Sequence, residues 1–133
     1  MNVMLVVGLP ASGKTHWAKK EVAQLRAVGA MAGLLDDPRT QDQLTEALSQ
    51  PGHTLFVTDP YLCLPEARKA ANEILTSAGH RVFTVFFAND PAQCLVNAGR
   101  RQDMSVTKFI NSLAQRYEVP NGAVTFPVYR ESL

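Results

Sequence analysis

The chain has 133 residues, of which 46% are hydrophobic and 19% charged, and its formal net charge at pH 7 is +1. This length fits one compact domain over residues 1–133, and the composition excludes a disordered or collagen-like chain. The nearly neutral charge provides no general attraction to nucleic acid, so contact with a polynucleotide would require a local basic patch.

The first predicted elements are a strand, a glycine-containing loop and a helix. Asn2–Val7 is a short valine-rich run typical of a buried strand, and a helix is predicted from about Lys14 to Ala27. The eight residues at the junction match the pattern G-x-x-x-x-G-K-[ST]: Gly8, Leu9, Pro10, Ala11, Ser12, Gly13, Lys14 and Thr15. Because that pattern is meaningful only between a strand and a helix, and both are predicted here, we expect a phosphate-binding loop.

Such a loop would bind a nucleoside triphosphate, ATP or another NTP, through all eight residues. Gly8 and Gly13 let the backbone turn tightly with its N–H groups pointing inward, and the helix N-terminus adds the positive end of a dipole. Lys14 is expected to reach the β- and γ-phosphates, and the Thr15 hydroxyl is expected to bind Mg²⁺.

The second strand is predicted over Met31–Leu35 and brings Asp36 and Asp37 to its carboxyl end. Proline favours the first position of a helix, so Pro38 predicts Asp37 as the N-cap of a helix that continues to about Ser49. Asp36 is left without a structural role, which makes it a candidate for chemistry.

The third strand is predicted over His53–Thr58 and is followed by Asp59. P-loop proteins place a carboxylate there that orients Mg²⁺ or its water, so Thr15 and Asp59 are the predicted metal-binding residues. An ATPase that activates water usually has a polar catalyst beside that carboxylate, whereas this chain has Pro60. We therefore expect phosphoryl transfer to an acceptor other than water.

The remainder of the chain continues the alternation of helices and strands. A helix after Pro65 is predicted to align four residues on one side: Ala67, Ala71, Ile74 and Ala78. A strand over Arg81–Ala88 is followed by a helix whose N-cap is Asp90 and which ends near Gly99. The last predicted elements are an exposed loop over residues 100–104, a helix with Val106, Ile110, Leu113 and Tyr117 on one face, and a strand over Ala123–Tyr129.

This alternation predicts the fold class. Right-handed β–α–β connections lead to a three-layer α/β/α fold with a central parallel sheet. With the predicted phosphate-binding loop after the first strand, this is the P-loop NTPase fold class. Ligands of such sheets bind at the carboxyl ends of the strands. The loop at Gly8, the pair Asp36 and Asp37, and Asp59 all follow strand ends, so we expect them to meet at one edge of the sheet.

Phosphoryl transfer needs a base for the acceptor hydroxyl, a cation for the acceptor and a cation for the transferring phosphate. Asp36 is the candidate base, and Arg39, on the predicted first helical turn, is the candidate that holds an anionic group of the acceptor. Arg100 and Arg101 follow a predicted helix end, where the helix dipole alone favours cations. As part of a lid they would instead close over the nucleotide phosphates.

Several segments together resemble a known family. The chain carries GLPASGKTHW, LLDDPR, VTDPYL, DPAQ and RRQ in the order found in the N-terminal kinase domain of phage polynucleotide 5′-kinases and their P-loop kinase relatives. The roles that this resemblance implies are Lys14 and Thr15 at the phosphates and Mg²⁺, Asp36 as general base, Arg39 on the acceptor phosphate, Asp59 near the active site, and Arg101, preferred over Arg100, in the lid. The family tends to have Asn where Tyr61 stands, and its lid is more basic. The resemblance therefore leaves the acceptor open.

We therefore expect an ATP- and Mg²⁺-dependent kinase that phosphorylates a hydroxyl on nucleic acid, either a 5′-OH end or a hydroxymethylated base of the kind used in phage DNA modification. A kinase for a nucleotide or another small molecule on the same scaffold stays open as an alternative. A second alternative is a nucleotide-binding module that signals through a partner, and it is disfavoured because Asp36 and Arg39 would then have no role.

The cysteines and the hydropathy predict the cellular setting. Cys63 and Cys94 are isolated and lack the spacing of a disulfide framework or a zinc site. No apolar run is long enough to span a bilayer, and the N-terminus lacks the pattern of a signal peptide. We expect a cytoplasmic protein with reduced thiols and no membrane partner, and the sequence indicates no oligomeric state.

Overall fold

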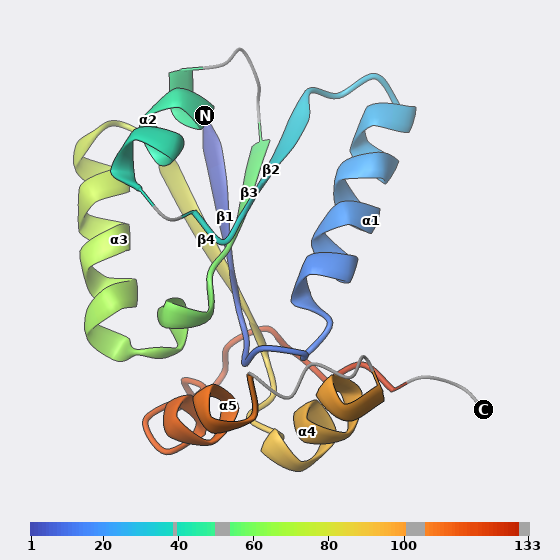
Figure 1. Ribbon diagram of the computed structural model, residues 1–133. Helices are drawn as coiled ribbons and strands as arrows, with labels where there is room; N and C mark the ends of the chain where they lie inside the picture. The colour runs from blue at the N-terminus through green and yellow to red at the C-terminus, as the bar shows by residue number, and fades with distance from the viewer. Residues whose placement is uncertain (39, 50–53, 101–105, 131–133) are drawn as a thin grey trace.

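The structure is a computed structural model that describes residues 1–38, 40–49, 54–100 and 106–130 (Figure 1). Its strands are β1 (Asn2–Val7), β2 (Ala32–Asp36), β3 (Thr54–Thr58), β4 (Arg81–Phe87) and β5 (Thr125–Phe126). Its helices are α1 (Lys14–Ala27), α2 (Gln41–Ser49), the 3₁₀-helix η1 (Pro60–Cys63), α3 (Pro65–Ser77), α4 (Pro91–Arg100) and α5 (Thr107–Ala114).

The strands form one five-stranded sheet in the order β2-β3-β1-β4-β5, and every neighbouring pair is parallel. Parallel neighbours need crossover connections, which place helices on the faces of the sheet. Figure 1 shows α1 on one face, α2 and α3 on the other, and α4 and α5 beyond the end of the sheet where β1 finishes. The predicted three-layer α/β/α fold with a central parallel sheet is confirmed.

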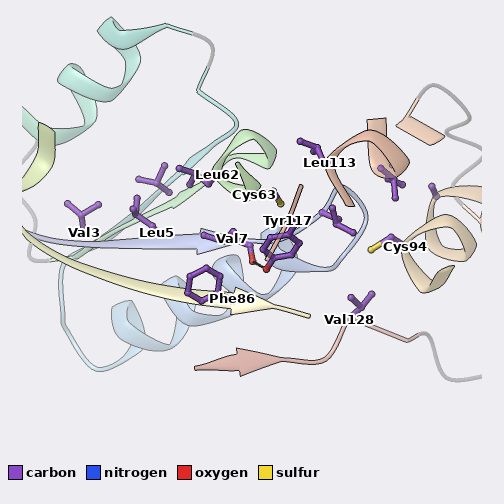
Figure 2. Packing of buried hydrophobic residues seen from close by; sticks show 14 of the residues in the cluster. Val3, Leu5, Val7, Leu62, Cys63, Phe86, Cys94, Leu113, Tyr117 and Val128 are labelled. Carbon is purple, nitrogen blue, oxygen red and sulfur yellow. Dashed lines mark hydrogen bonds between the residues drawn. The ribbon is translucent and has the colours of Figure 1, made fainter. Parts of the chain in front are cut away.

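The central strand β1 separates two apolar clusters because alternate side chains of a strand point to opposite faces. Val3, Leu5 and Val7 pack into the larger cluster, part of which Figure 2 shows, together with residues of α3, α4 and α5. Val6 packs into the smaller cluster under α1, against Ala18. Burial on both faces explains why this strand reads as a nearly continuous apolar run in the sequence.

The start of α2 differs from the prediction. The helix begins at Gln41, where Thr40 and Gln43 form a capping box: the Thr40 hydroxyl accepts from the Gln43 N–H and the Gln43 side chain accepts from the Thr40 N–H, each at 3.3 Å. Asp37 is therefore not the N-cap. It lies earlier, in a left-handed backbone conformation with φ of 50°, and its N–H donates to the Thr58 carbonyl at 2.6 Å.

Two further features differ from the prediction: the buried face of α3 and the length of the last strand. On α3 the predicted face residue Ala71 packs against the larger apolar cluster, but Leu75, with 2% of its surface exposed, is buried in place of Ile74, which is 53% exposed. The last strand spans only two residues, because Pro127 has no N–H for a sheet hydrogen bond and the Tyr129 N–H donates to the Ser12 carbonyl instead.

Both cysteines are buried and neither forms a disulfide within the described residues, and their chemistry is testable. Burial raises the pKa of the Cys63 thiol to about 12, so at pH 8 roughly one molecule in 10⁴ carries the reactive thiolate. We expect the folded protein to resist iodoacetamide at this pH and the protein in guanidinium chloride to take up two labels, counted by mass spectrometry. Rapid labelling of Cys63 in the folded protein would contradict the burial.

Among the residues that the structure describes, no helix is both long enough and apolar enough to cross a bilayer.

Candidate active site

The loop between β1 and α1 forms an anion cradle. Its backbone turns twice through the left-handed region, at Ala11 with φ of 66° and at Gly13 with φ of 94°, and the Ser12 N–H donates to the Leu9 carbonyl at 3.2 Å. Helix α1 begins at Lys14, so the N–H groups of its first turn have no partner within the helix. The positive end of the helix dipole and these N–H groups together favour a phosphate at this place.

Glycine is required at both ends of this loop. A β-carbon at position 8 would lie 2.6 Å from the Ser12 hydroxyl oxygen, and one at position 13 would lie 2.6 Å from the β-carbon of Tyr129. The Ser12 hydroxyl is fully buried, and among the described residues it has no hydrogen-bond partner. The loop is therefore tightly packed against the segment that follows β5.

We predict that Gly13→Ala both destabilises the protein and weakens ADP binding. The left-handed backbone costs an alanine about 1–2 kcal/mol, and the collision with Tyr129 displaces the loop or the segment after β5. Gly79→Ala is the matched control, since Gly79 has φ of 91° but nothing within 4 Å of the added carbon. Thermal unfolding and calorimetric titration should show destabilisation in both variants and weakened ADP binding only in Gly13→Ala. Equal ADP affinity in the two variants would contradict this.

Lys14 is buried at the base of the cradle, with 8% of its surface exposed. Its ammonium donates to the Leu9 carbonyl at 3.2 Å. Burial lowers the pKa of Lys14, because a poorly solvated environment disfavours the charged form, and the negative charge of Asp36 partly opposes that effect. A desolvated ammonium beside a phosphate-binding loop is arranged to receive an anion.

Asp36 is the carboxylate that touches the cradle. Its Oδ1 accepts a hydrogen bond from the Thr15 hydroxyl at 3.0 Å and one from the Thr58 hydroxyl at 2.5 Å. Asp36 ends β2, Thr58 ends β3, and the two residues pair across the parallel sheet, which brings them together. Thr58 is fully buried, so its hydroxyl anchors the Asp36 carboxylate to the interior of the protein. From the sequence, only its place at a strand end points to Thr58.

Asp59 lies near the same edge but has a local structural role. It is the N-cap of η1, and its Oδ1 accepts from the Tyr61 N–H at 2.9 Å. Burial raises the pKa of Asp59, and the negative charge of Asp37 raises it further. The hydrogen bond from Tyr61 and the positive charge of Lys14 act in the opposite direction. The predicted metal residue Thr15 is hydrogen-bonded to Asp36. The metal role of Asp59 stays a prediction.

The predicted arginines are placed only in part. Arg39 and Arg101 lie outside the described residues, and Arg100 is the last residue of α4. Their roles at the acceptor and in a lid therefore stay predictions.

A pocket of about 470 Å³ opens beside the loop, between the first turns of α1 and the segment after β5. Its lining residues are Gly13, His16, Trp17, Lys20, Phe87, Phe126, Pro127, Val128, Tyr129 and Arg130. This volume lies in the range of small-molecule sites, and Gly13 is shared by the pocket and the loop. Local sequence patterns do not predict this pocket, because α1 and the segment after β5 that line it are more than a hundred residues apart in the chain. The aromatic residues around β5 are the signal that the sequence offers.

The donor atoms fit a magnesium ion that arrives with a nucleotide. Mg²⁺ takes oxygen ligands and is usually held by one or two protein groups, water and substrate phosphates. The Thr15 hydroxyl supplies such an oxygen next to the cradle, where it donates to the Asp36 carboxylate at 3.0 Å. Across the described ranges, no group of three His, Cys, Asp or Glu side chains could hold a metal ion without other ligands.

Comparison with known proteins supports the fold. No protein-family profile matches the chain. It is 27% identical over 126 residues to the uncharacterized protein R277 of Acanthamoeba polyphaga mimivirus, covering 89% of this chain and 87% of that protein. The structure matches an APS kinase of Mycobacterium tuberculosis solved with AMPPNP and APS, with a TM-score of 0.65, 18% identity, and coverage of 98% of this chain and 90% of that one.

A gluconokinase from Sinorhizobium meliloti 1021 matches with a TM-score of 0.65 and 16% identity, covering 98% of this chain and 84% of that one. The protein APE1195 matches with a TM-score of 0.69 and 16% identity, covering 96% and 84%. Identities this low show a shared fold. The glycine-rich loop, the parallel sheet and these likenesses together establish that the chain has the P-loop NTPase fold.

Proposed function

We propose that the protein is an ATP- and Mg²⁺-dependent kinase that transfers a phosphoryl group to a hydroxyl of a small molecule. The observation that carries the proposal is the position of Asp36, whose carboxylate lies 3.0 Å from the Thr15 hydroxyl at the mouth of the phosphate-binding loop. A base held at that point is within reach of an acceptor hydroxyl that approaches the terminal phosphate of a nucleotide in the loop.

Bound MgATP supplies the γ-phosphoryl group and leaves as ADP. The loop N–H groups and the Lys14 ammonium hold the phosphates, and the Thr15 hydroxyl contributes an oxygen to the metal. Asp36 accepts the proton of the acceptor hydroxyl as its oxygen bonds to phosphorus. In this proposal Arg39 holds an anionic group of the acceptor, and Arg101 or Arg100 neutralises charge on the transferring phosphate.

Two observations favour a small-molecule acceptor. The structurally similar kinases are an APS kinase solved with APS and a gluconokinase. The formal net charge of this chain is only +1, which gives a polyanion no general attraction.

A hydroxyl on nucleic acid is the second candidate. The DDPR and TDPY segments support it through their resemblance to polynucleotide kinases. Tyr61, which is 55% exposed, also lies next to Phe109 with ring centroids 5.3 Å apart, and exposed aromatic rings are surfaces on which a base can stack.

The test is a panel of acceptors offered with ATP labelled at the γ-phosphate. The panel contains sugars and sugar acids, nucleosides and nucleotides, 5′-OH oligonucleotides and DNA with hydroxymethylated bases. Label on one or more small molecules is the expected result, and label on polynucleotides alone would replace the first candidate with the second. ATP binding without label on any acceptor would favour a nucleotide-binding module and overturn the kinase proposal.

A further inference from the structure

The amide of Asn97 on α4 joins two distant parts of the candidate nucleotide site. Only 9% of its surface is exposed, and its Nδ2 donates to the Ala11 carbonyl and to the Tyr129 carbonyl, each at 2.9 Å. These partners are 86 and 32 residues away in the sequence. The Asn97 Oδ1 accepts from the Gln93 side chain at 3.0 Å, one turn earlier on the same helix. Both amide hydrogens and the oxygen are therefore engaged, which fixes the orientation of the group.

Each carbonyl belongs to a different wall of the site. Ala11 lies in the phosphate-binding loop, in a left-handed conformation that a residue with a β-carbon seldom adopts. Tyr129 lines the pocket beside the loop. The Tyr129 N–H also donates to the Ser12 carbonyl at 3.0 Å, so the loop and the segment after β5 are hydrogen-bonded to each other as well as to Asn97.

We propose that Asn97 is a positioning residue that holds the phosphate-binding loop and the pocket wall in the relative geometry needed to bind a nucleotide. The inference rests on the proposed function, since it takes the ligand to be a nucleotide that spans both parts. Asn97 acts through backbone carbonyls and does not touch the ligand. Without its two donated hydrogen bonds, the Ala11 peptide can relax from its left-handed conformation, and Tyr129 loses one of the two bonds that fix it over Gly13.

The position of the amide explains why a buried polar side chain is present on this face of α4. Its neighbours Cys94 and Ala98 are fully or almost fully buried and pack in the larger apolar cluster. An apolar residue at position 97 would satisfy packing alone, but it would remove the donor that the Ala11 and Tyr129 carbonyls share. The hydrogen bonds therefore hold the loop and the pocket wall in place, and the experiment measures how their loss changes nucleotide binding.

The test compares Asn97→Leu with Asn89→Leu. Asn89 is a matched control, because its Nδ2 also donates to two carbonyls, those of Ala114 and Tyr117, each at 3.0 Å, but neither belongs to the loop or the pocket. Binding of ADP is followed through the fluorescence of Trp17, the single tryptophan, which lines the pocket. We expect the Kd for ADP to rise about tenfold in Asn97→Leu, as expected for the loss of one to two hydrogen bonds, and to stay within about twofold in Asn89→Leu.

Steady-state kinetics separate positioning from a loss of folded protein. At a temperature where each variant is fully folded, Asn97→Leu should raise KM for ATP and leave KM for the acceptor unchanged. If Asn97→Leu does not fold, Gln93→Leu carries the test, since it removes only the bond that orients the amide and should raise the Kd for ADP about threefold. An unchanged Kd for ADP in the folded variant would overturn the proposal.

The same experiment distinguishes this inference from the proposed function. Binding of ADP needs no acceptor, so a wild-type protein that binds ADP but phosphorylates nothing overturns the kinase and leaves the role of Asn97 to be decided by the variants. A wild-type protein that does not bind ADP overturns both.

Discussion

Replacing Asp36 with asparagine should lower kcat for phosphoryl transfer by about 10²–10⁴-fold, the usual contribution of a general base. Asparagine keeps the shape of the side chain and an oxygen that can accept from the Thr15 and Thr58 hydroxyls. The change removes the negative charge and the proton acceptor but leaves the phosphate-binding loop intact. The Kd for ADP, measured by calorimetry, should therefore stay within about threefold of the wild-type value.

Asp37→Asn is the matched control for this experiment. Asp37 is the next residue, and asparagine tolerates its left-handed conformation, with φ of 50°. We expect Asp37→Asn to keep kcat within a few-fold of the wild-type value. A large loss in Asp37→Asn combined with normal transfer by Asp36→Asn would show that the neighbouring carboxylate is the base.

Replacing Lys14 with methionine should abolish most transfer without destabilising the fold. In the proposed reaction the Lys14 ammonium stabilises the charge of the transferring phosphate, and loss of such a group lowers kcat by about 10²–10³-fold. Methionine fills similar space without a charge, and replacing a buried charge with an apolar side chain is often neutral or stabilising. The Ser12 N–H still donates to the Leu9 carbonyl, so the loop keeps that bond.

The stability of Lys14→Met should also depend on pH in a defined direction. Burial lowers the pKa of Lys14 in the folded protein, so the cost of burying its charge is fully present at pH values below that lowered pKa. The cost disappears as the pH rises from the folded pKa towards the unfolded value of 10.5. The free energy of unfolding of the variant, measured in urea, should exceed that of the wild type near neutral pH, and the difference should narrow in alkali. A variant that is less stable than the wild type at pH 7 would contradict a desolvated lysine.

The local features of this site could be predicted from the sequence. The phosphate-binding loop is a contiguous motif, and its flanking strand and the bounds of α1 follow from local periodicity. Asp36 was selected because it follows a strand and has no capping role, and the structure places it beside Thr15. The positions of the loop and of Asp36 could be predicted because each depends on residues close together in the chain or on the general rule that parallel strands end at one edge.

The features that were missed depend on contacts between distant segments. The hydrogen bonds from Asn97 reach residues 86 and 32 positions away, and Thr58 meets Asp36 only through the pairing of two strands. The N-cap of α2 was misassigned because Asp37 and Thr40 are both good capping residues, and the reciprocal bonds with Gln43 decide between them. On α3, Ala71 packs against the larger apolar cluster and either Ile74 or Leu75 could follow it at helical spacing; the structure buries Leu75.

The most direct test follows the γ-phosphate by phosphorus NMR while the wild-type protein acts on MgATP, with and without the acceptor panel. Water is disfavoured as the acceptor because Pro60 stands next to Asp59, where an ATPase usually has a polar catalyst. We expect the γ-phosphate signal to disappear rapidly only when a suitable acceptor is present and to reappear as a phosphate ester. Release of inorganic phosphate at the same rate with every acceptor and with none would contradict a kinase.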